Sequence, residues 1–221
     1  MADKMRPDWC DLPVGRRIAY AGHRAFVGGN DPETWYGIGL LQYHFLIGRG
    51  LRPDHRFLDL GCGALRLGQL LIPYLEAEHY FGLEPAAELV ELGLRHEVPD
   101  FISEMKQPRF AYNAEFDVSF CPGFDHAIAQ SIFTHMTAED IGACFARIRP
   151  AAAPGARFYF TFFEGDDAKN TIGPSHANLG WNYRFEQIEA LAARGGWRAE
   201  YIGDWRHPRE QMMAVATPLE S

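Results

Sequence analysis

The chain has 221 residues, of which 47% are hydrophobic and 23% are charged, and its formal net charge is −8 at pH 7. At about 150 residues per domain this length favours one domain or one domain with an appendage, and no segment approaches the ~20 consecutive apolar residues of a membrane span. An acidic surface repels a phosphate backbone, which argues against nucleic acid as a partner.

The cysteines Cys10, Cys62, Cys121 and Cys144 are too far apart in the sequence to form a CxxC pair. This spacing excludes a zinc ribbon and a thioredoxin-like redox site. Residues 1–17 contain no apolar stretch of signal-peptide length. We therefore expect a cytoplasmic protein with reduced thiols and no membrane partner.

The first part of the chain is rich in glycine and aromatic residues. Its clearest pattern is a set of apolar residues at helical spacing, namely Trp35, Ile38, Leu41, Phe45 and Leu46. This pattern predicts a helix from about Glu33 to Arg49, ended by Gly50. We expect residues 1–55 to form an N-terminal helical appendage to a domain of residues 56–221.

From Arg56 onward, short apolar runs alternate with helical stretches. The runs predict strands over 57–60, 80–83, 109–112, 126–129, 158–163, 197–202 and 212–216. Helices are predicted over 65–75, 85–96, 137–148 and 184–194, and a turn over 151–155. Such alternation is typical of a mainly parallel sheet covered on both faces. The last two strands are joined by too few residues for a crossover helix, so they should pair antiparallel.

The most informative segment is Phe57-Leu58-Asp59-Leu60-Gly61-Cys62-Gly63-Ala64-Leu65-Arg66, in which a strand runs into a glycine turn and then a helix. Glycines permit backbone conformations and close approaches that a side chain would block. Arg66 replaces the third glycine of a dinucleotide-binding motif and the P-loop lysine is missing, which disfavours NAD, FAD and ATP. Glu84 follows about 20 residues later, where a carboxylate reaches the ribose hydroxyls of an adenosine.

Two segments carry a family resemblance. Asp59-Leu60-Gly61-Cys62-Gly63, followed by Gly82-Leu83-Glu84-Pro85, resembles the class I S-adenosylmethionine-dependent methyltransferases. The segments 124–135 and 149–158 resemble the family's fourth strand with its loop and the turn into its fifth strand. The resemblance covers about residues 55–217. It implies a Rossmann-like, doubly wound α/β fold with seven mostly parallel strands, of which the last is antiparallel.

The resemblance also implies which residues bind S-adenosylmethionine. These are Asp59, Gly61, Cys62, Gly63, Arg66, Glu84, Pro85, Asn113, Glu115, Phe116, Gln130 and Ser131. Asp59 and the two glycines would line the methionine part, and Glu84 would hold the ribose. Either Asn113 or Glu115 would meet the adenine amino group. Leu65 departs from the small residue of many members, and Arg66 could pair with the cofactor carboxylate or face solvent.

The residues for the methyl acceptor are less specific. His135 is the candidate catalytic base because histidine titrates near neutral pH, with a capping or core role as the alternative. The candidate substrate residues are Trp35, Tyr36, Glu164, His176, Trp181 and Tyr183. The last four belong to a long connection after the fifth predicted strand, and such loops are often functional. The spacing of His135, Glu164 and His176 does not favour a metal site.

The resemblance thus implies methyl transfer to a small-molecule acceptor by in-line displacement, with oxygen favoured over nitrogen as the methylated atom. S-adenosylhomocysteine would be the product. Two alternatives stay open on the same fold. One is a noncatalytic module that binds S-adenosylmethionine or S-adenosylhomocysteine, and the other is an aminopropyl-type transferase. The identity of the acceptor, the use of a base and the oligomeric state cannot be read from the chain.

Overall fold

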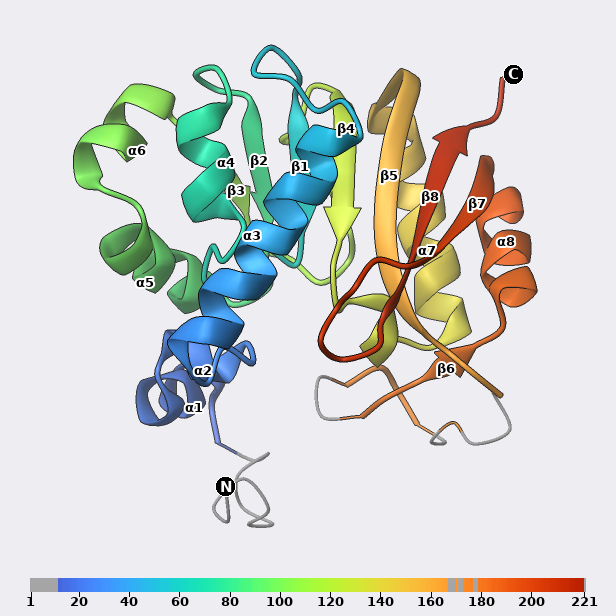
Figure 1. The fold of residues 1–221 in the computed structure, drawn as a ribbon, viewed down its shortest axis with the longest axis horizontal. Helices are drawn as coiled ribbons and strands as arrows, with labels where there is room; N and C mark the ends of the chain where they lie inside the picture. The colour runs from blue at the N-terminus through green and yellow to red at the C-terminus, as the bar shows by residue number, and fades with distance from the viewer. Residues whose placement is uncertain (1–11, 167–169, 171–172, 177–178, 221) are drawn as a thin grey trace.

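A central sheet with helices on both faces organises the protein (Figure 1). The computed structural model describes residues 12–166, 170, 173–176 and 179–220. The main path of the sheet has the strand order β3-β2-β1-β4-β5-β8-β7, and the short β6 pairs with β5. The strands are β1 (Phe57–Leu60), β2 (Tyr80–Leu83), β3 (Arg109–Ala111), β4 (Phe124–Ala129), β5 (Ala152–Glu164), β6 (Asn182–Tyr183), β7 (Trp197–Asp204) and β8 (Met212–Pro218).

Strand direction follows the length of the connections. Strands β1 to β5 pair parallel with one another, and helices or longer segments connect them. Strand β8 pairs antiparallel with both β5 and β7, and it lies between them. The predicted Rossmann-like, mostly parallel sheet with an antiparallel last strand is therefore confirmed.

Alternation along the buried strands divides the core into two layers. On one face, Phe57 of β1 and Tyr159 of β5 pack with helices α3 (Pro32–Gly48), α4 (Gly68–Tyr74) and α5 (Ala87–Glu97). On the other, Leu58 and Phe158 pack with α7 (Ala138–Ile148) and α8 (Phe185–Arg194). Because both faces are covered, the strands are continuous apolar runs.

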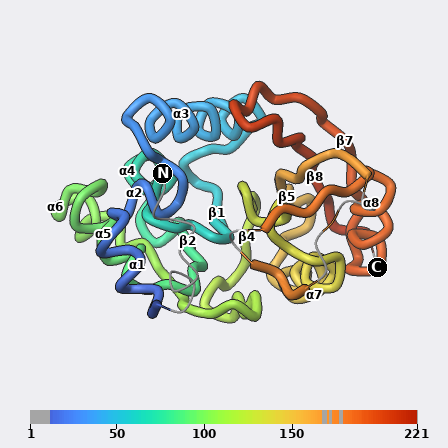
Figure 2. Tube along the Cα trace, turned by 90° about the horizontal axis from the view of Figure 1, so that it is seen from below, coloured from blue at the N-terminus to red at the C-terminus, as the bar shows by residue number. Residues whose placement is uncertain are grey.

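The N-terminal part is helical, as expected. It forms α1 (Val14–Ala21), α2 (His23–Phe26) and α3. The side chain of Asp31 caps α3 by accepting a hydrogen bond from the Thr34 N–H at 2.7 Å, and Pro32 occupies the first turn. Figure 2 shows α1 and α2 beside α5, while α3 runs past α4 towards the β7–β8 connection.

Several details differ from the sequence prediction, among them the short strand β6, which was not predicted. A helix that was not predicted, α6 (Asp100–Lys106), precedes β3. Helix α4 begins later than predicted because residues 64–67 form a turn. The predicted turn over 151–155 is wrong for residues 152–155, which belong to β5. There the register partners are Phe124 with Ala152 and His126 with Arg157. The step from one pair to the next is two residues in β4 but five in β5, so β5 contains a bulge. The bulge accommodates Pro154, which cannot donate a ladder hydrogen bond.

Among the described residues, every helix is too short or too polar to cross a lipid bilayer. The thiols of Cys62, Cys121 and Cys144 are free and buried. The remaining predicted thiol, Cys10, lies outside the described residues.

Candidate cofactor and acceptor sites

The turn after β1 requires glycine. The φ angles of Gly61 and Gly63 are +67° and +54°, in the left-handed region that side chains disfavour. A Cβ atom on Gly61 would lie 2.1 Å from Cδ1 of Ile132, which follows β4. The turn and the end of β4 are therefore in close contact. Leu65 adopts a φ of +61° in the same turn, although it is not glycine.

Glu84 follows β2 and binds the backbone of this turn. Its Oε2 accepts a hydrogen bond from the Gly63 N–H at 3.1 Å, and its Oε1 accepts one from the Ala86 N–H at 3.0 Å. Burial raises the pKa of Glu84 above its usual value, against the effect of these two hydrogen bonds. Pro85 beside it is exposed. The carboxylate is thus fixed at the carboxyl ends of two adjacent parallel strands.

A second carboxyl group lies below the turn. Asp59 of β1 is 5% exposed, and it accepts a hydrogen bond from the Tyr80 hydroxyl at 2.7 Å. Burial raises the pKa of Asp59 to about 7; the Tyr80 hydrogen bond opposes this shift, and the Glu84 charge adds to it. Burial, together with both carboxylates, also raises the pKa of the Cys62 thiol. A positively charged ligand group would favour the ionised form of Asp59.

Arg66 is buried, and it forms no ion pair with a carboxylate of the described residues. Its Nη2 donates a hydrogen bond to the Val27 carbonyl at 2.6 Å, and its guanidinium lies 5.1 Å from the centre of the Trp35 ring. Burial lowers the pKa of Arg66 to about 10, and the charge of Arg209 acts in the same direction. The expectation that Arg66 faces solvent is wrong, because the N-terminal segment covers it.

The loop after β3 holds the three candidate adenine-binding residues. Asn113 bonds the backbone of Asp117 with both ends of its side chain, at 3.0 and 3.1 Å. Glu115 is exposed, and its carboxylate accepts a hydrogen bond from the Ala114 N–H. Phe116 has a φ of +57° and packs against the core. The Asn113 amide therefore shapes this loop, and the Glu115 carboxylate is the freer of the two polar groups.

Gln130 and Ser131, at the end of β4, belong to a polar cluster that sequence reasoning missed. Gln130 binds Gln42 of α3 at 2.9 Å, and its amide nitrogen lies 3.1 Å from Oε1 of Gln211 and 3.2 Å from Nε2 of His207. We call this set the glutamine cluster: Gln42, Gln130, Ser131, Thr161, His207 and Gln211. It joins the ends of β4 and β5 to α3 and to the β7–β8 connection.

Comparison with known proteins addresses the fold. No protein-family model matches the chain. A methyltransferase dependent on S-adenosylmethionine from Clostridium acetobutylicum is similar at a TM-score of 0.65 and 14% identity, over 94% of this chain and all of that one. The magnesium protoporphyrin IX methyltransferase of Synechocystis with bound S-adenosylhomocysteine is similar at 0.63 and 14% identity, over 88% of this chain and 91% of that one. The chain therefore shares its fold with these two methyltransferases.

In a methyltransferase fold, His135 lies just beyond β4. It ends a short 3-10 helix (Phe133–His135), and its Nδ1 lies 2.6 Å from the Leu179 carbonyl. A carbonyl only accepts hydrogen bonds, so Nδ1 carries the ring hydrogen and Nε2 can accept a proton. The backbone carbonyl of His135 also accepts a hydrogen bond from the His176 N–H at 3.1 Å.

The six candidate substrate residues do not converge in this fold. Trp35, Trp181 and Tyr183 are buried in the core, where the Tyr183 hydroxyl donates to the Met136 carbonyl at 2.7 Å. The others have exposed side chains, namely Tyr36, Glu164 and His176. Glu164 accepts a hydrogen bond from the Tyr201 hydroxyl at 2.7 Å. In the described part of the chain, no three His, Cys, Asp or Glu side chains gather as metal ligands would.

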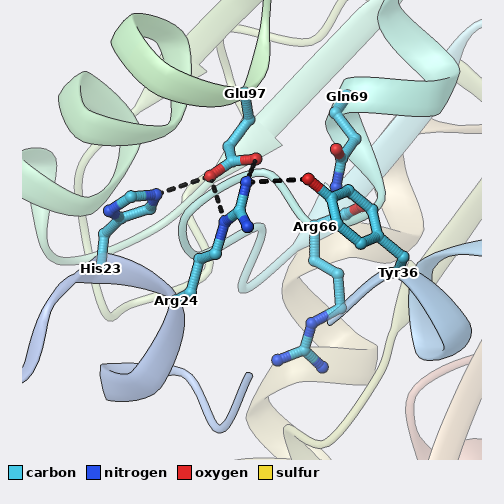
Figure 3. Close-up of polar contacts among 6 residues, drawn as sticks. All are labelled: His23, Arg24, Tyr36, Arg66, Gln69 and Glu97. Atoms are coloured by element: carbon cyan, nitrogen blue, oxygen red, sulfur yellow. Dashed lines mark hydrogen bonds and ion pairs between the residues drawn. The ribbon is translucent and has the colours of Figure 1, made fainter. Parts of the chain in front are cut away.

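An ion pair fastens the N-terminal helices to this methyltransferase fold (Figure 3). Glu97 at the end of α5 accepts two hydrogen bonds from Arg24 at 2.7 Å and lies 2.6 Å from the His23 ring nitrogen. Its side chain is 1% exposed. Arg24 also donates to the Tyr36 hydroxyl at 3.1 Å. The Arg66 guanidinium points away from this carboxylate (Figure 3), so it does not share the ion pair.

Proposed function

We propose that the chain is an S-adenosylmethionine-dependent methyltransferase that methylates an oxygen atom of a small-molecule acceptor. One observation carries the proposal: the half-buried carboxylate of Glu84 accepts a hydrogen bond from the Gly63 N–H of the glycine turn at 3.1 Å, at the carboxyl end of adjacent parallel strands. Open α/β sheets bind their ligands at this edge. A carboxylate there can accept hydrogen bonds from the ribose hydroxyls, and the missing lysine of a P-loop argues against a nucleoside triphosphate.

The residues at this edge fit the cofactor. Gly61 and Gly63 leave the turn without side chains, so a ligand can approach the backbone closely. The carboxyl groups of the buried Asp59 and the half-buried Glu84 lie near Cys62, because burial and then the charges of both raise the pKa of its thiol. Two carboxyl groups favour a ligand that carries positive charge on sulfur and nitrogen.

Bound S-adenosylmethionine supplies a methyl group on a positively charged sulfur, which is already activated for in-line displacement. The tasks of the chain are therefore to orient the two reactants and to exclude water. Alignment alone contributes about 7–11 kcal/mol to lowering such a barrier. Nε2 of His135 is the candidate proton acceptor for a hydroxyl acceptor that must lose its proton, and such a base contributes about 10²–10⁴-fold.

We assign residues 1–55 the role of a cap and residues 56–221 that of the catalytic domain. Val27 supports this division, because its Cγ1 lies 3.2 Å from the place where a Cβ of Gly63 would be. The cap thus covers the glycine turn, and the ion pair between Arg24 and Glu97 holds it there. Three buried free thiols and the net charge of −8 favour a cytoplasmic location without a nucleic-acid partner.

Ligand binding tests the proposal first. S-adenosylmethionine and S-adenosylhomocysteine should each raise the melting temperature, because a ligand that binds only the folded state stabilises it. NAD and ATP should leave it unchanged. Transfer of a labelled methyl group to a set of alcohols, phenols, carboxylic acids and amines then separates a methyltransferase from a noncatalytic module. Binding without transfer to any acceptor, or transfer of a propylamine group, would contradict the proposal.

A further inference from the structure

The glutamine cluster is buried but is not saturated with hydrogen bonds. Gln42 is 4% exposed, and among the described residues its Oε1 has no hydrogen-bond partner. The amide nitrogen of Gln130 lies within 3.2 Å of polar atoms of Ser131, His207 and Gln211, although it carries only two hydrogens. Buried polar groups are normally all paired. The cluster therefore retains hydrogen-bonding capacity for a ligand.

The more accessible residues of the cluster directly precede the residue that contacts the glycine turn. Gln130 and Ser131 are half-buried, whereas Gln42, His207 and Gln211 are buried. The residue after Ser131 is Ile132, whose side chain packs on the turn after β1. A molecule held at Gln130 and Ser131 would lie beside the proposed cofactor site.

The cluster contains no carboxylate and no lysine. Burial lowers the pKa of its single histidine, His207, to about 4, and the charges of Arg209 and Arg66 act in the same direction. His207 is therefore neutral at pH 7. Its Nδ1 accepts a hydrogen bond from the Arg209 backbone N–H at 3.3 Å, so Nε2 carries the ring hydrogen. This N–H lies 3.2 Å from the amide nitrogen of Gln130, which is also a donor, so the two groups do not satisfy each other.

Two cations without carboxylate partners flank the cluster. Arg66 is 9% exposed, and its Nε lacks a hydrogen-bond partner within the described part of the chain. Arg209 is exposed and donates to the Gly28 carbonyl. The ion pairs found among the described residues include neither of them. Burying a guanidinium without a counter-charge is unfavourable, so a negatively charged ligand group would be favoured here.

We propose that the glutamine cluster is the acceptor site and that it selects acceptors whose reacting oxygen is negatively charged, namely carboxylates and acidic phenols or enols, over amines. The inference rests on the proposed methyl transfer. Arg66 and Arg209 repel a protonated amine, and no cluster residue has a negative charge to take its proton. Neutral amide, hydroxyl and imidazole groups can orient an oxyanion by hydrogen bonds.

Such an acceptor needs no general base. A lone pair of its oxygen forms a bond to the methyl carbon while the bond from methyl to sulfur breaks. The electron pair of that bond goes to sulfur, so the negative charge of the oxygen and the positive charge of the sulfur cancel. No proton is released, and His135 is then not required for transfer.

The ionisation of 4-nitrophenol, followed by the absorbance of its phenolate, tests this inference. The titration is made with saturating S-adenosylhomocysteine and also without it. We expect the protein to increase the ionisation constant of the bound phenol about tenfold, since nearby cations favour the phenolate. Arg209→Gln should abolish the increase. Arg206→Gln removes the same charge from an exposed position of the same connection and should retain it.

Three results would overturn the inference. The first is an unchanged ionisation constant in the wild-type protein. The second is an equal loss in both arginine variants, because net charge alone would then explain the effect. The third is an increase that disappears when S-adenosylhomocysteine binds, because the carboxylate of that ligand would then occupy the cations.

Calorimetry of S-adenosylhomocysteine binding separates the proposed methyl transfer from the proposed oxyanion site. Failure to bind defeats the proposed function, and the titration without this ligand still decides whether the cluster binds an oxyanion.

Discussion

The Glu84 carboxylate and the Gly63 N–H form a hydrogen bond of 3.1 Å across 21 positions of the sequence. This bond joins the end of β2 to the turn after β1, so one side chain both shapes the turn and presents a carboxylate to a ligand. The two roles can be separated by comparing stability with affinity, and this comparison gives the first prediction.

Glu84→Ala should weaken binding of S-adenosylhomocysteine at least about tenfold, because a buried hydrogen bond to a charged group contributes about 1.5–3 kcal/mol. Isothermal calorimetry measures the affinity and thermal unfolding measures the stability. Glu104→Ala, on the exposed face of α6, is the matched control and should bind normally. An affinity within twofold of wild type for Glu84→Ala would contradict the ribose assignment.

Gly61→Ala should destabilise the protein by about 1–2 kcal/mol through its left-handed backbone, with a further cost from the contact with Ile132. Adding Ile132→Ala should relieve the contact but not the backbone strain, so the free-energy changes of the two substitutions should not be additive. Urea unfolding of the single and double variants measures these free energies.

Gly37→Ala serves as the control for this pair. Gly37 is exposed within α3, and a Cβ there meets nothing within 4 Å. This substitution should be neutral or stabilising by up to about 1 kcal/mol, since alanine favours a helix. Equal destabilisation at Gly61 and Gly37 would contradict the backbone argument.

Strands β1 and β2 could be predicted to the residue, because both are apolar runs buried on two faces and ended by polar or glycine residues. The glycine turn could be predicted from the same pattern. The glutamine cluster could not. Gln42, Gln130 and Gln211 are more than 80 residues apart and resemble ordinary surface residues, and only the strand order brings them together.

The environment of Arg66 could not be predicted from the sequence either. Its partners, Val27 and Trp35, come from the N-terminal part of the chain. The helical spacing of Trp35 predicts a helix, but it does not show which residue of the other domain this helix covers. Trp181 and Tyr183 show the converse, because their place in a long connection predicts a pocket and does not predict that both side chains are buried in the core. Burial of irregular segments depends on tertiary contacts, which composition does not encode.

Arg24→Met should loosen the cap. It leaves the Glu97 carboxylate, which is 1% exposed, with His23 as its remaining partner. Breaking such a pair costs about 2 kcal/mol or more, and Arg24→Met combined with Glu97→Gln should recover part of it. The rate of tryptic cleavage after Arg16 and Arg17 measures how firmly the cap is attached. Cleavage at the wild-type rate in Arg24→Met would contradict its anchoring role.

Acid should have the same effect as this substitution. Burial raises the pKa of Glu97, but its hydrogen bonds with Arg24 and His23 outweigh burial and hold the pKa below the usual value. A carboxyl group whose pKa is lowered by folding stabilises the protein above its unfolded pKa and loses this contribution as the pH falls through the folded pKa. The wild type should therefore lose stability in urea unfolding below about pH 4.5, and the double variant should lose much less.

Asp59 should have the opposite pH dependence. Folding raises its pKa from 3.8 to about 7, so its contribution to stability is complete below the unfolded pKa and is lost as the pH rises through the folded pKa. Asp59→Asn should therefore gain about 2–3 kcal/mol relative to wild type between pH 5 and 8. Urea unfolding at several pH values measures the difference, with Asp100→Asn, which is exposed in α6, as the control.

Binding of a cationic ligand should ionise Asp59, so calorimetry near pH 7 in buffers of different ionisation enthalpy should detect proton release in the wild type and not in Asp59→Asn. A pH-independent difference between the two proteins would show that Asp59 is already ionised in the free protein.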